Sequence, residues 1–248
     1  MLDFRLDGHT ALVTGAGRGL GLAIADGLQE LGATVYGTAR DATNAATVAE
    51  RYGTTAVTLD VTDVRSVRRA VDALFESGVE IDLLVNNAGI NAPGPALDLE
   101  PEAWDSVYAA NVRGLFFTSQ AVARQWVASG IRGSIVNIGS QAGSVAIEER
   151  AAYGSSKAAV AQLTRNLALE WAAAGIRVNT VAPTFVRTEL TASTLARGEW
   201  AAELQSRIPL GRFGEPSEVV GGVAYLLGGA ASLVTGHTLA IDGGYTIR

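Results

Sequence analysis

Tyr153 and Lys157, a tyrosine and a lysine spaced four residues apart, carry the first chemical signal in this sequence. Residues 151–174 have the pattern of a helix, so this spacing places both side chains on one helical face. A nearby ammonium group stabilises the tyrosinate and lowers the tyrosine pKa from its ordinary value of about 10. Such a tyrosine can give and take protons near neutral pH. The same spacing also suits an ordinary Tyr–Lys pair on a helix surface, and Ser140, which follows an apolar run, suits a plain turn.

Two turns that contain glycine follow apolar runs elsewhere in the chain. Residues 14–21 (TGAGRGLG) lie between a short apolar run and a helical pattern. Glycines there permit a tight turn and the close approach of a pyrophosphate, which the N-terminus of the helix attracts. Residues 86–89 (NNAG) suit a turn in which the backbone passes close to a ligand. The first turn predicts a nucleotide site.

The residues after the second and third apolar runs bear on the choice of nucleotide. NAD sites usually carry a carboxylate after the second strand, but this sequence has Ala39 and Arg40 there. Arg40 and Arg18 suit a 2′-phosphate, so we predict NADP(H) as the favoured cofactor, with NAD(H) possible. Both arginines also suit a solvated surface. Asp60 either accepts a hydrogen bond from an adenine amino group or, like Thr62, caps the helix that follows.

Short apolar runs alternate with amphipathic helical patterns along the whole chain. The runs cover residues 10–14, 34–38, 57–61, 81–85, 134–138, 176–181 and 238–241. The helical patterns cover residues 20–31, 64–74, 101–130 (as one long helix), 151–174 and 216–227. Continuous apolar runs favour strands that are buried on both faces of a parallel sheet. We therefore predict an α/β fold over residues 1–248, a single doubly wound Rossmann-type domain with helices on both faces of the sheet.

Composition excludes several other classes of protein. The 248 residues include no cysteine and two histidines, which excludes disulfides, thiolate metal sites and a His-rich site, so no metal is expected. A net charge of −6 argues against nucleic acid and anionic membranes as partners. No stretch is long and apolar enough to span a membrane, and the start of the chain lacks a signal-peptide pattern. We expect a soluble cytoplasmic protein.

Taken together, these segments resemble the classical short-chain dehydrogenase/reductase family over the whole chain. The matching segments are TGAGRGLG (14–21), Asp60-Val61, NNAG (86–89), Asn111, Ser140, YGSSK (153–157) and the run 179–188. The resemblance implies an oxidoreductase that interconverts a secondary alcohol and a ketone, with hydride moving between the nicotinamide and the substrate carbon.

The same resemblance implies a role for each residue of the site. Tyr153 would be the general acid/base, Ser140 would hydrogen-bond the substrate oxygen, and Lys157 would bind the nicotinamide ribose and lower the Tyr153 pKa. Asn111 would hold a water through its main chain. The cofactor contacts would come from Gly15, Arg18, Gly19, Leu20, Gly21, Arg40, Asp60, Val61, Asn87, Ala88, Gly89, Tyr153, Lys157, Pro183, Val186 and Thr188. The family usually has glycine after Pro183, where this chain has Thr184, so the backbone there must differ slightly.

The substrate is the less determined part of the resemblance. A lid over residues 188–212, expected to be mobile, would cover it; alternatively, this segment is an ordinary helical pair. Several segments look like those of sugar and polyol dehydrogenases, with polar contacts available from Gln141, Glu148, Glu149 and Arg150. An NADPH-dependent carbonyl reductase or 3-oxoacyl-[acyl-carrier-protein] reductase is the alternative. A non-catalytic nucleotide-sensing protein is a remote one, because such proteins usually lose the tyrosine, lysine or serine.

The resemblance also implies a homotetramer. Residues 101–130 and 151–174 would form one interface, and the C-terminal run 237–248 would form another. Alanines along the two long helical patterns would allow close helix approach. They equally suit packing of these helices on the sheet of their own subunit.

Overall fold

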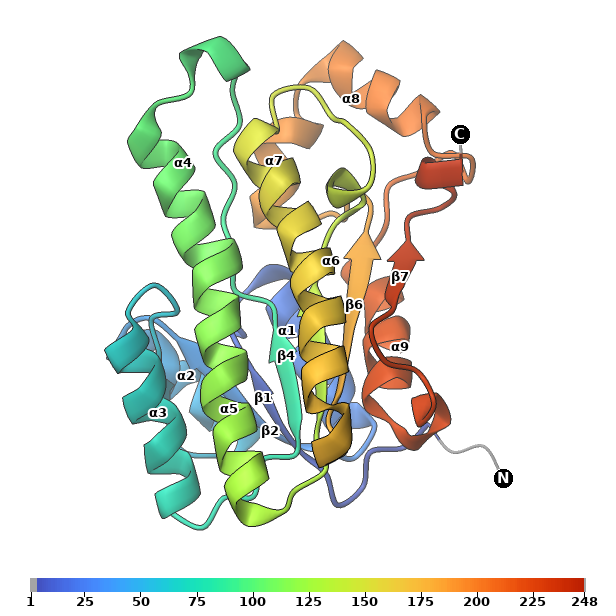
Figure 1. Ribbon diagram of the computed structural model, residues 1–248. Coiled ribbons are helices and arrows are strands. Elements are labelled where there is room, and N and C mark those ends of the chain that lie inside the picture. Colours follow the sequence, from blue (N-terminus) through green and yellow to red (C-terminus); the bar gives the residue numbers. More distant parts are fainter. Residues whose placement is uncertain (1–3, 248) are drawn as a thin grey trace.

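A seven-stranded parallel sheet forms the centre of the protein (Figure 1). The computed structural model describes residues 4–247. The strands are β1 (Thr10–Val13), β2 (Thr34–Ala39), β3 (Val57–Thr58), β4 (Leu83–Asn86), β5 (Ser134–Ile138), β6 (Arg177–Pro183) and β7 (Thr238–Ile241). They lie in the order β3-β2-β1-β4-β5-β6-β7. The predicted strands and the doubly wound α/β class are confirmed, although β3 ends three residues earlier than predicted.

Helices cover both faces of this sheet (Figure 1). They are α1 (Gly19–Glu30), α2 (Ala42–Tyr52), α3 (Val64–Glu76), α4 (Pro101–Tyr108), α5 (Leu115–Ser129), α6 (Ala151–Trp171), α7 (Glu189–Leu195), α8 (Gly198–Ser206) and α9 (Pro216–Leu227). One core joins the sheet to α1, α2 and α9, and a second core joins its other face to α3, α5 and α6. Within β1, Val13 enters the first core and Leu12 the second, which explains why the run is apolar without alternation.

Chain order reverses between β1 and β4, which lie side by side although two strands and three helices separate them in sequence. From β1 the chain moves outward to β2 and β3, and it then returns to β4 and continues the other way. The loops that leave β1 and β4 therefore diverge and open a crevice at the carboxyl edge of the sheet. Both turns singled out in the sequence, residues 14–21 and 86–89, lie at this edge.

Two helical segments differ from the sequence-based prediction. The long helix predicted over 101–130 is interrupted by a π-helical stretch, Ala109–Gly114, between α4 and α5. Gly114 explains part of this break, because an added Cβ would lie 2.6 Å from the Val61 carbonyl oxygen and only glycine allows so close a crossing. Helix α2 was not predicted, although Asp41 caps it and Gly53 ends it in a left-handed conformation.

The segment after β6 forms α7 and α8 and has a small core of its own. Leu204 and Ala201 of α8 are buried with Phe185, Phe213 and Tyr245, the last from the C-terminal turn Tyr245–Ile247. The segment thus packs its apolar side on the domain, as an ordinary helical pair does. Among residues 4–247, no helix combines the length and the apolarity needed to cross a bilayer. The domain predicted over residues 1–248 also includes residues 1–3 and 248, which lie outside the described residues.

Candidate active site

A network of hydrogen bonds joins the loops after β1 and β4 at the crevice. The Thr14 hydroxyl accepts hydrogen bonds from the backbone N–H groups of Asn87 (2.9 Å) and Ala88 (3.0 Å). The Asn87 side-chain amide donates to the carbonyls of Thr14 (3.0 Å) and Gly15 (3.3 Å). The sequence-predicted residues of the two turns are therefore brought together, and their own contacts fix the floor of the crevice.

Glycine is required at two places on this floor. Gly15 has φ of 67°, a conformation that other residues rarely adopt. A Cβ on Gly21 would lie 2.2 Å from the Gly15 carbonyl oxygen and 2.4 Å from the Asn87 amide nitrogen. The first turn of α1 therefore lies directly against the loop that precedes it. Neither an acidic residue nor a side-chain cap occupies the first turn of α1, which leaves its N–H groups suited to an anion.

The residues predicted to decide whether NADP or NAD binds lie at the rim of the crevice. Arg18 and Arg40 are both exposed at the carboxyl ends of β1 and β2. Asp60 does not cap the next helix, and neither does Thr62; that position belongs to Asp63, whose carboxylate accepts from the N–H of Arg65. Instead one Asp60 oxygen accepts from the Thr62 N–H and hydroxyl at 2.9 and 2.7 Å. The cationic rim and the glycine floor fit a dinucleotide cofactor.

Helix α6 presents Tyr153 and Lys157 toward the end of β5. The Lys157 ammonium donates to the Ile138 carbonyl oxygen at 2.7 Å and lies 5.6 Å from the centre of the Tyr153 ring. Its side chain is buried, and it is the only lysine in the sequence. Ser140 follows β5 and hydrogen-bonds Tyr153. The three side chains predicted from the sequence thus meet at one point.

Burial governs the ionisation of this group. It raises the pKa of Tyr153, although the hydrogen bond with Ser140 and the charge of Arg150 act in the opposite direction. It lowers the pKa of Lys157 to about 8. Burial therefore outweighs the groups that lower the Tyr153 pKa, and the lowering expected from Lys157 stays a prediction. Residue types and spacing revealed the charge partner but not the loss of water around the phenol.

Asn111 lies inside the π-helical stretch and is almost fully buried. Its side-chain oxygen accepts from the Ile90 N–H at 2.8 Å, and its amide donates to the Ile90 carbonyl at 2.9 Å. The same amide donates to Ser156 of α6 at 3.1 Å. Asn111 therefore ties the segment after β4 to the helix that carries Tyr153 and Lys157.

A pocket opens beside Tyr153 and Ser140. Its other lining residues are Asn91, Gln141, Ala142, Ile147, Arg150, Thr184, Phe185, Leu190, Thr191 and Thr194. Three of its polar atoms, Asn91 Oδ1, Gln141 Oε1 and Thr184 Oγ1, are buried and have no hydrogen-bond partner within the protein. Buried polar atoms of this kind are costly unless a ligand or water satisfies them.

The sequence predicted only part of this pocket. Of the four polar residues proposed to contact hydroxyls, Gln141 and Arg150 line it, whereas Glu148 is exposed and Glu149 pairs with Arg197. Asn91 was missed, although it lies two residues after the NNAG turn, which is a signal that could have identified it. Thr184 stands where the family usually has glycine, and its φ is not positive.

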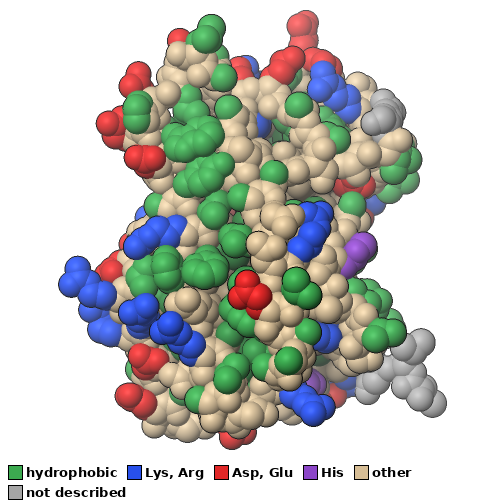
Figure 2. Space-filling model, in the orientation of Figure 1, with side chains coloured by type: hydrophobic (Ala, Val, Ile, Leu, Met, Phe, Trp, Pro, Cys, Tyr) green, Lys and Arg blue, Asp and Glu red, His purple; other side chains and the backbone are tan. Residues whose placement is uncertain are grey.

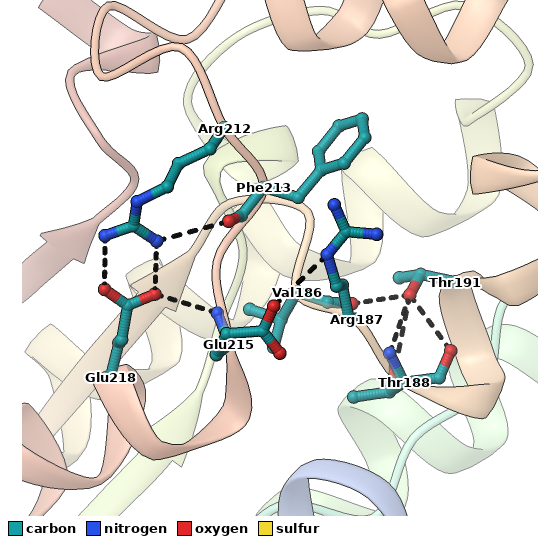
Figure 3. Close-up of polar contacts among 8 residues, drawn as sticks. All are labelled: Val186, Arg187, Thr188, Thr191, Arg212, Phe213, Glu215 and Glu218. Carbon is teal, nitrogen blue, oxygen red and sulfur yellow. Dashed lines mark hydrogen bonds and ion pairs between the residues drawn. The ribbon is translucent and has the colours of Figure 1, made fainter.

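The segment that joins β6 to α9 is clamped at its base (Figure 3). The backbone N–H of Arg187 donates to the Gly214 carbonyl at 3.0 Å, which joins the two ends of the segment. The Thr191 hydroxyl donates to the Val186 carbonyl at 2.5 Å and closes a capping box with Thr188. These contacts fix Val186 and Thr188 close behind Pro183, the last residue of β6.

A double ion pair completes the other end of this base. Arg212 donates to both carboxylate oxygens of Glu218, at 2.7 and 2.6 Å, and this interaction lowers the pKa of Glu218 to about 2. Glu218 also accepts from the Glu215 N–H at 2.8 Å, and Glu215 lies 3.2 Å from Arg187 (Figure 3). The segment therefore leaves and rejoins the domain through a rigid base.

A parallel doubly wound sheet with a glycine floor at its switch point and a Ser–Tyr–Lys group beside it defines a nucleotide-dependent oxidoreductase. The family described as enoyl-(acyl carrier protein) reductase matches residues 15–246. The D-threitol dehydrogenase of Mycolicibacterium smegmatis is 41% identical over 253 aligned positions, which cover 99% of this chain and 96% of that protein. The galactitol 2-dehydrogenase (L-tagatose-forming) of Cereibacter sphaeroides is 42% identical, with coverage of 98% and 97%.

Solved structures agree with these sequence relatives. A gluconate 5-dehydrogenase from Burkholderia cenocepacia, in complex with NADP and tartrate, superposes with a TM-score of 0.96 at 38% identity, over 99% of this chain and 98% of that chain. The chain belongs to the classical short-chain dehydrogenase/reductase family. It is an oxidoreductase that acts on CH–OH groups with a nicotinamide cofactor.

Proposed function

We propose that this enzyme interconverts a secondary alcohol and a ketone on a sugar-type or polyol-type substrate. The observation that carries the proposal is the pocket beside Tyr153, where three buried polar atoms lack partners in the protein. Hydroxyl groups of a polyhydroxylated substrate would donate to Asn91 and Gln141 and would bond Thr184, and so remove the cost of leaving these atoms unpaired. The threitol, galactitol and gluconate dehydrogenases among its relatives support the same class.

Tyr153, Ser140 and Lys157 carry the proton chemistry in this proposal. When bound, the nicotinamide cofactor supplies the hydride chemistry. Tyr153 gives a proton to the substrate oxygen in reduction and takes it back in oxidation, while Ser140 hydrogen-bonds that oxygen and orients it. Lys157, with a pKa of about 8, exchanges protons near neutral pH and would bind the nicotinamide ribose. Asn111 holds the helix that carries both residues and would order a water that links Lys157 to solvent.

NADP(H) is the cofactor we propose as preferred. Arg18 and Arg40 are exposed on the rim where an adenosine ribose would lie, and Ala39 supplies no carboxylate for a 2′-hydroxyl. The floor residues Gly15, Gly19, Leu20, Gly21, Asn87, Ala88 and Gly89 would hold the pyrophosphate and riboses. Asp60 and Val61 would hold the adenine, and Pro183, Val186 and Thr188 would hold the nicotinamide.

Residues 188–212 act as a substrate lid in this proposal. A Cβ on Gly19 would lie 2.9 Å from a carboxylate oxygen of Glu189, the first residue of α7. A pyrophosphate held at this glycine would therefore meet a like charge, and α7 would have to shift or turn its carboxylate away. The clamped base leaves α7 and α8 as the parts that move.

A homotetramer is the assembly we propose, with α4, α5 and α6 at one interface. Hydrophobic side chains gather over α4 and α5 (Figure 2). Trp104 and Tyr108 stack with ring centres 4.9 Å apart, and exposed Val127 and Leu169 extend the apolar surface toward α6. Apolar surface of this extent on a folded protein is typical of an association site.

A Tyr153→Phe variant tests the proposed chemistry. It keeps the ring and loses the proton, so we expect turnover of polyols with NADP to fall roughly 10²–10⁴-fold, with cofactor affinity changed less than about threefold. The control is Tyr225→Phe, a change of the same type in α9. The measurements are reduced-nicotinamide absorbance, with NADP and NAD compared, and a fluorescence titration of cofactor binding. Unchanged turnover would remove Tyr153 from the mechanism, and inactivity of the wild type toward polyols and ketoses would contradict the substrate class.

A further inference from the structure

Arg150 is a buried cation on the wall of the substrate pocket. It immediately precedes α6, three residues before Tyr153, and only 6% of its surface is exposed. Its guanidinium donates to the Thr194 hydroxyl at 2.8 Å and to the Glu149 carbonyl at 3.0 Å. These two neutral acceptors use two of its five N–H groups. The remaining N–H groups of the planar, charged guanidinium are therefore available to a ligand beside Tyr153.

The charge of the neighbouring Glu149 stabilises Arg150 without forming an ion pair with it. The ion pairs within residues 4–247 do not include Arg150, because the adjacent Glu149 directs its carboxylate to Arg197 at 2.5 Å. Both arginines lie near the Trp200 ring, whose centre is 5.5 Å from the Arg150 guanidinium carbon and 4.0 Å from that of Arg197. Buried charges in proteins are normally held in ion pairs, so a buried cation that lines a ligand pocket outside any ion pair of the described residues indicates an anionic ligand.

The backbone before Arg150 adopts a costly conformation that aims it at the pocket. Within residues 4–247, Glu149 is the only residue other than glycine with a positive φ, at 59°. Its carbonyl accepts from both Gly94 (3.2 Å) and Arg150, so the turn is held from two sides. Strain of this kind persists where the surrounding structure fixes it, most often at functional sites.

We infer that Arg150 binds a carboxylate of the substrate, so that the preferred substrate is a polyhydroxylated acid of the aldonate or ketoaldonate type rather than a neutral polyol. The inference rests on the proposed function. A carboxylate would accept two parallel N–H bonds from the guanidinium, while the substrate hydroxyls bond Asn91, Gln141 and Thr184. The reaction stays balanced: the CH–OH group loses a hydride to NAD(P)⁺ and a proton through Tyr153, and it becomes a ketone.

The test compares matched substrates that differ in charge at one end, D-gluconate with D-glucitol and L-threonate with L-threitol. The wild type should have a higher kcat/KM for the acid of each pair, and tartrate should inhibit it competitively. In Arg150→Gln, the ratio of kcat/KM for acid to kcat/KM for polyol should fall roughly 10- to 100-fold, with a weaker inhibition by tartrate. Arg150→Lys should restore part of the ratio because it keeps the charge without the fork.

Arg165→Gln is the matched control, since it removes an exposed arginine from α6, the helix that follows Arg150. Its acid-to-polyol ratio should stay within about twofold of the wild type. If Arg150→Gln lowers kcat/KM equally for the acid and for the polyol, Arg150 only holds α7 and α8 in place and the inference is wrong. A wild type that prefers the neutral polyol, or a sugar phosphate, overturns the inference and leaves the proposed function intact. Inactivity toward both members of each pair and toward the wider polyol and ketose panel contradicts the proposed function itself.

Discussion

The two ends of the crevice differ in how completely the chain satisfies its own polar groups. On the cofactor side, Thr14 and Asn87 bond each other's loops, and glycines close the remaining space to within about van der Waals contact. On the substrate side, Asn91, Gln141 and Thr184 leave buried atoms without partners, and Arg150 takes part in no ion pair of the described residues. Folding completes the contacts of Thr14 and Asn87 on the cofactor side, where one atom, Asn86 Oδ1, is left buried without a partner, whereas the groups of the substrate side gain partners only when a ligand binds.

This difference separates stability from specificity. Residues on the cofactor side contribute to both folding and binding, because the same contacts shape the floor and hold two strands' loops together. Residues on the substrate side carry unsatisfied atoms that cost folding free energy and gain their partners from the substrate. Substitutions on the two sides should therefore have opposite signatures, with loss of stability on the first and loss of selectivity on the second.

Gly21→Ala should have the largest effect, because its Cβ would lie 2.2 Å from the Gly15 carbonyl oxygen. The loop must shift, so we expect cofactor affinity to fall at least about 100-fold and the free energy of unfolding to fall by roughly 1–3 kcal/mol. Cofactor titration and denaturant unfolding measure the two changes. Gly221→Ala in α9, where an added Cβ meets no atom within 4 Å, is the control and should be neutral or slightly stabilising. Full cofactor affinity in Gly21→Ala would show that the floor is not rigid.

Arg40→Asp should have an intermediate effect on the rim of the cofactor side. It replaces a cation suited to a 2′-phosphate with a carboxylate suited to a 2′-hydroxyl. We expect the kcat/KM ratio of NADP to NAD to fall roughly 10- to 100-fold, which is the size of one or two charge-assisted hydrogen bonds. Arg68→Asp, the same charge change on the exposed face of α3, should leave the ratio within about twofold. A ratio that stays constant in Arg40→Asp would make Arg40 a surface residue without a role in cofactor choice.

Lys157→Met should have the smallest effect on stability, and the effect should be a gain. Burial lowers the Lys157 pKa from 10.5 to about 8, so at pH 7 folding must bury an ammonium that is charged in both states. Replacing it should raise the free energy of unfolding by roughly 1–2 kcal/mol at pH 7 while removing activity. Between pH 8 and 10.5 the folded lysine is neutral and the unfolded one is still charged, so wild-type stability should rise with pH and the gain should disappear.

Denaturant unfolding at pH 7, 8.5 and 10 measures the difference in the free energy of unfolding between Lys157→Met and the wild type. Arg165→Met, which removes an exposed cation from the same helix, should change the free energy of unfolding by less than about 0.5 kcal/mol at every pH. A destabilised Lys157→Met variant would mean that the hydrogen bond from Lys157 to Ile138 outweighs the cost of burial.

Sequence reasoning succeeded where local chemistry determines structure. The continuous apolar runs predicted seven strands, and the spacing of glycines around residue 15 predicted the floor of the crevice, because these features follow from neighbouring residues. It failed where distant contacts decide. The π-helical stretch at Asn111 depends on Gly114 crossing the Val61 carbonyl, and the Tyr153 pKa depends on how much water the fold removes. The pocket residues Asn91 and Thr184 carry no periodic pattern at all.

Lys157 has a practical consequence beyond its chemistry. Every other one of the 19 lysine and arginine residues is an arginine, so the protein offers a single side-chain amine to amine-selective reagents and to lysine-specific isotope labelling. That amine donates to the Ile138 carbonyl oxygen at the end of β5, and the residue as a whole is 6% exposed. One lysine resonance or one lysine-borne mass shift would therefore follow the protonation, accessibility and occupancy of the reaction centre, without signals from other lysine side chains.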